Sequence, residues 1–149
     1  MVPRFSLDGL LPVGLHEPSS WQEFEGVFGF NAHRRRLLAG LKLACYSLAD
    51  AGCTTVYVNG SFVTNKELPG DTDVCWDDDG VDFDRIDPVF DLGEKPREKR
   101  VEQKERFGGE FFPASMEVER PGQRFLDFFQ KGRDGIPKGI VKLNLELLL

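Results

Sequence analysis

Two aspartates separated by one residue, Asp71 and Asp73, follow a Leu-Pro-Gly turn and open an apolar run. In a β-strand, side chains two positions apart point to the same face, so the two carboxylates lie roughly 7 Å apart along the backbone. Two carboxylates on one face repel each other and are costly to desolvate, which favours a cation between them. The pair therefore predicts a site for a divalent cation.

A second chemical element, Gly60 followed by Ser61, ends a β-rich run nine residues before the first aspartate. Glycine permits a positive φ and a close backbone approach, and Ser61 can open a short helical turn whose N–H groups face an anion. Thr64 and Lys66 follow at positions from which they would contact phosphate oxygens. For Lys66, an exposed turn residue is the alternative. Together with the aspartates, these residues predict a site for a metal-chelated polyphosphate.

This combination resembles the signature of the nucleotidyltransferase superfamily, which has the polymerase-β-like fold. That signature is a hydrophobic residue, Gly-Ser, about nine to thirteen further residues, and then Asp-x-Asp. The resemblance implies that Gly60 and Ser61 hold the phosphates of a nucleoside triphosphate. It also implies that Asp71 and Asp73 bind Mg²⁺ or Mn²⁺ and take part in catalysis.

Superfamily members that transfer nucleotides carry a third carboxylate on the strand beside Asp-x-Asp, where it acts as a general base towards the incoming hydroxyl. Glu110 is the best-placed candidate in this sequence, on an expected strand over residues 108–113, and Glu117 comes next. A solvated, outward-facing glutamate is the alternative interpretation of Glu110.

Further segments extend the resemblance to a small bacterial family of unknown function with a nucleotidyltransferase fold. Related minimal proteins belong to toxin–antitoxin or defence operons and move AMP or another NMP onto a protein or an RNA. The resemblance therefore implies an operon partner protein and a protein or RNA acceptor. The segments that carry it are residues 11–14, 31–36, 56–76, 128–130 and 138–140.

Composition indicates a single globular domain over residues 1–149, with 40% hydrophobic and 30% charged residues. A net charge of −6 argues against general DNA binding by phosphate neutralisation. Cys45, Cys53 and Cys75 lack metal-ligand spacing and read as reduced, buried thiols. With no apolar run of membrane-spanning length, the sequence predicts a cytoplasmic protein with no membrane partner.

The elements that would position these residues form an α+β domain, a minimal nucleotidyltransferase fold in which helices pack against a mixed central sheet. Residues 1–18 read as an extended N-terminal arm. An apolar stripe at helical spacing follows a capping asparagine, Asn31, and predicts a helix that ends near Gly52. Strict alternation over residues 138–147 predicts a half-buried strand at a sheet edge. Further elements are expected at residues 21–27 (helix), 54–59 (strand), 71–76 (strand), 82–90 (helix) and 122–130 (helix).

Two charged segments are harder to place. Arg34, Arg35 and Arg36 lie in the first turn of the long helix, where cations are disfavoured by the helix dipole. A solvated face is the default for them, and a phosphate or partner contact is the alternative. Residues 93–107 are highly charged and predict a solvent-exposed helix or a mobile segment, to which no chemistry is assigned.

Two functions fit these features. The first, which we favour, is a metal-dependent nucleotidyltransferase that moves an NMP group from a nucleoside triphosphate to a protein or RNA acceptor. The alternative is a non-catalytic binding module of the same fold, acting as a nucleotide sensor or an antitoxin-like partner protein.

Overall fold

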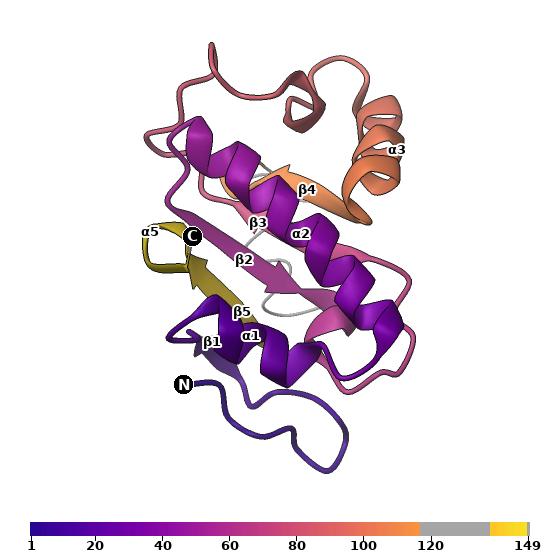
Figure 1. Ribbon diagram of the computed structural model, residues 1–149. Helices are drawn as coiled ribbons and strands as arrows, with labels where there is room; N and C mark the ends of the chain where they lie inside the picture. Colours follow the sequence, from indigo (N-terminus) through magenta and orange to yellow (C-terminus); the bar gives the residue numbers. More distant parts are fainter. Residues whose placement is uncertain (117–137, 149) are drawn as a thin grey trace.

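The computed structural model describes residues 1–116 and 138–148. Five strands form one mixed sheet in the order β1-β5-β2-β3-β4, and helices pack against it, which confirms the predicted α+β class (Figure 1). The helix predicted at residues 122–130 lies outside the described residues. The strands are β1 (Gly14–His16), β2 (Thr55–Asn59), β3 (Thr72–Trp76), β4 (Gly109–Pro113) and β5 (Gly139–Asn144).

The sheet order corrects the prediction for the last strand. β5 lies between β1 and β2, parallel to the first and antiparallel to the second, rather than at an edge. Its inward residues Val141 and Leu143 are fully buried. The strand that covers it, β1, comes from the segment predicted to be an extended arm. Alternation along one strand reports which face is buried, but it carries no information about lateral neighbours.

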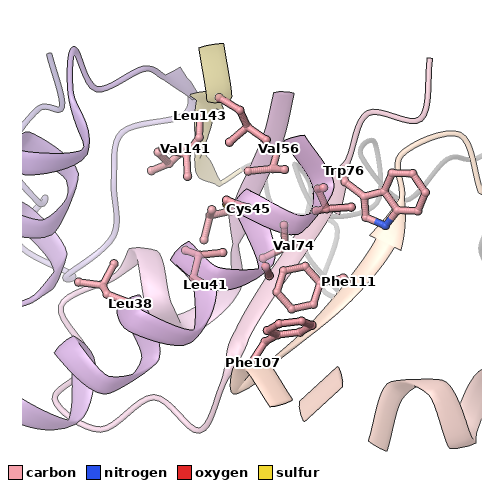
Figure 2. Packing of buried hydrophobic residues seen from close by; sticks show 14 of the residues in the cluster. Leu38, Leu41, Cys45, Val56, Val74, Trp76, Phe107, Phe111, Val141 and Leu143 are labelled. Atoms are coloured by element: carbon pink, nitrogen blue, oxygen red, sulfur yellow. The ribbon is translucent and has the colours of Figure 1, made fainter. Parts of the chain in front are cut away.

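The long helix α2 (Ala32–Asp50) crosses one face of the sheet (Figure 1). Its apolar stripe packs on strand residues that alternate inward, as Figure 2 shows for Leu41 and Cys45 beside Val56 and Val74. The face covered by α2 is called the core face below. The opposite face is called the open face for short, although it too carries buried side chains, among them Asn59 and Cys75. The predicted stripe is confirmed, because all of its members are buried: Leu37, Leu38, Leu41, Ala44, Cys45 and Leu48.

The shorter helix α1 (Trp21–Phe28) begins as its capping box predicts, with the Ser20 hydroxyl accepting a hydrogen bond from the Glu23 N–H at 3.0 Å. Its Phe24 and Phe28 rings contact Phe62, which follows the Gly-Ser corner. The aromatic contact therefore ties α1 to the segment that carries the corner.

The segment after β3 departs from expectation. Of the helix predicted at residues 82–90, only the short 3₁₀ turn η2 (Pro88–Phe90) forms, because Asp82 and Asp87 each accept a hydrogen bond from a backbone N–H two residues on. The next helix, α3 (Pro96–Phe107), packs beside β4 (Figure 1). A four-residue helix, α5 (Leu145–Leu148), follows β5.

The three cysteines are free and buried, as predicted. Among the described residues, no helix is long and apolar enough to cross a membrane.

Candidate functional site

The Gly-Ser corner lies directly against the second aspartate of the acidic pair. β2 ends at Asn59, and Gly60 turns the chain with φ +75° into the 3₁₀ turn η1 (Gly60–Val63). A Cβ atom added to Gly60 would stand 2.4 Å from Asp73 Oδ2, so the carboxylate would have to move to admit a side chain. The left-handed backbone favours glycine at this position, and the missing Cβ leaves the space that the carboxylate occupies.

Sheet register places Glu110 beside the same aspartate. Asp73 on β3 pairs with Asn59 on β2 on one side and with Glu110 on β4 on the other. Residues directly opposite each other share a face, with Cα atoms about 4.5–5.5 Å apart in an antiparallel pair. Because Val74 is on the core face, this row of three polar residues lies on the open face, and Asp71 joins it by alternation. The structure thus places Asp73 beside Gly60 and Glu110, and Asp71 comes two residues earlier on the same side of the chain.

Two cations on α3 contact the outer carboxylates of this group. Lys104 Nζ lies 3.3 Å from Asp71 Oδ2, and an Arg100 Nη atom lies 3.3 and 3.2 Å from the two Glu110 oxygens. All four side chains keep some exposure, between 21% and 54%. The sequence analysis assigned no chemistry to this helix, so Arg100 and Lys104 are site residues that it missed.

A buried glutamine fixes α3 in this position. Gln103 Nε2 donates to the Val89 carbonyl at 2.8 Å, and Gln103 Oε1 accepts from the Phe111 N–H of β4 at 2.8 Å. Gln103 has no exposed surface, so both bonds are shielded from water. The segment is therefore an anchored helix with most of its side chains exposed, which confirms the first of the two predicted alternatives, a solvent-exposed helix. The sequence spacing could have identified these residues as a group, because Arg100, Gln103 and Lys104 share one helix face at i, i+3 and i+4.

The loop between the corner and the aspartates is held by the first turn of α2. Arg34 is fully buried and donates to the carbonyls of Phe62, Thr64 (2.8 Å) and Lys66 (3.4 Å), as well as Phe28 (2.7 Å). Both interpretations of Arg34 from sequence, a solvated face or a phosphate contact, are therefore wrong. Burial lowers the pKa of Arg34 to about 10, so it stays charged at neutral pH.

Two neighbours of Arg34 extend this contact along the loop. Asn31 caps α2 through Oδ1, which accepts from the Arg34 N–H, while its Nδ2 donates to the Glu67 carbonyl at 2.7 Å. His33 Nε2 donates to the Pro69 carbonyl at 2.5 Å. We call Asn31, His33 and Arg34 the loop clamp. It sets the path of the chain from η1 to Asp71.

Three further residues were predicted to contact phosphate, and the structure gives them different surroundings: Ser61, Thr64 and Lys66. The Thr64 hydroxyl donates to the Ser61 carbonyl at 2.6 Å and accepts from the Lys66 N–H at 3.1 Å, so it stabilises the turn itself. Ser61 is half-buried beside the corner, and the Lys66 side chain is exposed. The structure thus places Ser61 at the site, and gives Thr64 a local structural role.

The metal-binding capacity of the site depends on oxygen ligands. In residues 1–116 and 138–148, no three His, Cys, Asp or Glu side chains gather closely enough to hold a metal ion. A neutral oxygen lies beside Asp73, because Asn59 is its partner across the strands and neither amide atom of the buried Asn59 side chain has a hydrogen-bond partner. Hard oxygen donors of this kind suit Mg²⁺ or Mn²⁺. Cys75 shares the open face, but burial and the nearby Asp73 charge raise the pKa of its thiol, which keeps it neutral.

These observations define an α+β domain in which a glycine corner lies against one carboxylate, Asp73, and two further carboxylates lie along the same face of a mixed sheet. The family comparison goes one step further. Residues 3–144 match the model of a family of unknown function (DUF6932), and the chain belongs to that family. No curated protein and no solved structure matches the chain.

Proposed function

We propose that this protein is a metal-dependent nucleotidyltransferase that moves an NMP group from a nucleoside triphosphate to a protein or RNA acceptor. One observation carries the proposal: the Gly60 corner touches the Asp73 carboxylate, and the strand register sets Glu110 beside it. A phosphate-approaching corner, a paired acid and a third carboxylate on the adjacent strand are the groups that such a transfer needs.

In the proposed reaction, the Gly60–Ser61 corner holds the phosphates of the nucleotide, and Asp71 and Asp73 hold Mg²⁺ or Mn²⁺. The bound ion supplies positive charge that offsets the charge of the phosphates. Glu110 accepts the proton of the acceptor hydroxyl, whose oxygen bonds to the α-phosphorus. The bond from that phosphorus to the bridging oxygen breaks, and pyrophosphate leaves.

The α3 cations take on a second task in this scheme. Glu110 acts as a base only when Arg100 releases one of its oxygens, and the released guanidinium is then free for the charge of pyrophosphate. Lys104 pairs with Asp71 in the same way, so it would release the Asp71 carboxylate when that carboxylate binds the metal ion. Phosphate charge and the divalent ion would thus replace two internal ion pairs with new ones.

The same ion pairs favour a second candidate, a non-catalytic binding module. Lys104 and Arg100 already pair with Asp71 and Glu110, so the charges of these two carboxylates are balanced without an ion. Under this alternative, the open face binds a nucleotide or a partner protein without turnover. The toxin–antitoxin or defence context and the cytoplasmic location belong to both proposals and rest on the sequence.

The test is incubation of the chain with labelled nucleoside triphosphates, Mg²⁺ or Mn²⁺, and cell lysate. The Asp71→Asn/Asp73→Asn variant is expected to abolish label transfer. Its matched control is Asp79→Asn/Asp84→Asn, which removes the same charge from exposed positions and should transfer normally. Nucleotide binding without transfer in the unchanged chain would support the binding module, and absence of binding would exclude both.

A further inference from the structure

The Asn59 side chain is buried without a hydrogen-bond partner. Its exposed fraction is 1%, and neither Oδ1 nor Nδ2 has a partner. An unsatisfied buried amide destabilises a folded protein, because it has given up its hydrogen bonds to water. An apolar residue at this position would avoid that cost. Other buried positions of the same strand, Val56 and Val58, do hold apolar residues. The fold therefore carries an unused polar group in the middle of its sheet.

The position of Asn59 relates that group to the candidate site. It is the last residue of β2, directly before Gly60, and its Cα partner across the strands is Asp73. Opposite residues of an antiparallel pair point to the same face, so the amide and the carboxylate lie side by side. Because Asp73 in turn pairs with Glu110, the amide stands at the inner end of a row of acidic groups.

We infer that the Asn59 side-chain oxygen is a third protein ligand for the divalent cation held by Asp71 and Asp73. The inference rests on the metal site of the proposed function and adds a residue to it. The residue that faces the amide across the strands, Asp73, is a carboxylate, so a cation ligated by oxygen atoms suits this position better than an anion does. Amide oxygens are ordinary ligands of hard cations. Coordination would also give the orphaned oxygen the partner that it lacks.

Thr72 provides a control that distinguishes metal binding by Asn59 from a general effect of removing a buried, unpaired polar group. Thr72 lies between the two aspartates in sequence, and its hydroxyl is likewise buried and unpartnered. By strand alternation it faces the core side, away from the acidic row. Thr72→Val is therefore a matched control that removes an orphaned polar group of the same strand pair without touching the open face.

The experiment measures Mn²⁺ binding to the full chain by electron paramagnetic resonance, without nucleotide, alongside urea unfolding without metal. Asn59→Leu is expected to weaken Mn²⁺ binding at least about tenfold, the loss usual when a metal site is disturbed, while its stability without metal is unchanged or higher. Thr72→Val should bind Mn²⁺ as the unchanged chain does. Asn59→Asp keeps an oxygen ligand and should retain or tighten Mn²⁺ binding. This variant tests the inference if the leucine variant fails to fold.

Unchanged Mn²⁺ binding in Asn59→Leu, with binding lost in Asp71→Asn/Asp73→Asn, would overturn the inference and leave the proposed function standing. Binding that depends on Asn59 in a chain that transfers no nucleotide would refute the proposed function alone. A chain that binds no Mn²⁺ at all would refute the inference and its metal site together.

Discussion

The loop between the corner and Asp71 and the helix α3 are both anchored by buried side chains, but they differ in what they present to the candidate site. The loop is held by the clamp, in which the fully buried Arg34 donates to backbone carbonyls. The helix α3 is anchored by the buried Gln103, whereas its Arg100 and Lys104 side chains reach the carboxylates through part-exposed ion pairs. Shielded bonds to the backbone fix a geometry, whereas exposed ion pairs exchange at little cost. The comparison indicates a rigid glycine corner facing a cationic side whose ion pairs exchange more easily.

The largest expected effect breaks the rigid side. Arg34→Met keeps the apolar stem but leaves the buried carbonyls of Phe28 and Phe62 without their donor. At about 1–3 kcal/mol for each orphaned group, the free energy of unfolding should fall by roughly 3 kcal/mol or more in urea unfolding. The exposed Arg36→Met, two residues on, should change it by less than about 0.5 kcal/mol. Equal effects of the two variants would show that the clamp does not stabilise the fold.

The corner itself is the next target. Gly60→Ala forces a side chain into the left-handed region and against the Asp73 carboxylate, so a loss of about 1–2 kcal/mol is expected, together with weaker Mn²⁺ binding. Gly70→Ala is the control, because a Cβ there meets nothing within 4 Å. Thermal unfolding and Mn²⁺ titration of both variants measure the difference. A Gly60→Ala chain as stable as its control would contradict the required close approach.

The exchangeable side should respond in binding rather than in stability. Lys104→Met removes a part-exposed ion pair, so the free energy of unfolding should change by at most about 1 kcal/mol. Mn²⁺ binding should tighten, because Asp71 loses a competing cation, and the gain should shrink near 1 M salt, where the screening length is about 3 Å. The control is Arg97→Met, on the same helix and exposed. Weaker Mn²⁺ binding in Lys104→Met would refute competition at Asp71.

The smallest effect concerns a second ion pair of α3, away from the site. The hydrogen bond from Arg106 lowers the pKa of Asp87. A carboxyl whose folded pKa lies below its unfolded value of about 3.9 stabilises the fold above that value, and the contribution is lost as the pH falls through the folded pKa. Arg106→Met should therefore cost about 0.2–1 kcal/mol at neutral pH, since the pair is part-exposed, and nothing in strong acid. Urea unfolding across pH tests this, and a pH-independent difference would contradict it.

The sequence by itself determined the local elements and most of the candidate site. The Asn31 cap, the α2 stripe and the alternation around Val74 depend on residues only a few positions apart, so periodicity and capping chemistry predict them. The spacing from Gly60 to Asp73 likewise predicted a meeting that the strand pairing produces.

Tertiary structure alone decided which distant groups satisfy one another. Arg34 reaches the Phe62 carbonyl 28 residues away, a contact that no helical pattern encodes. The place of β5 inside the sheet and the row from Asn59 through Asp73 to Glu110 follow from strand order and register. Local patterns report whether a residue is buried or capped, whereas its partner across the fold depends on how whole elements pack, because hydrogen bonds and ion pairs form between surfaces that come together only on folding.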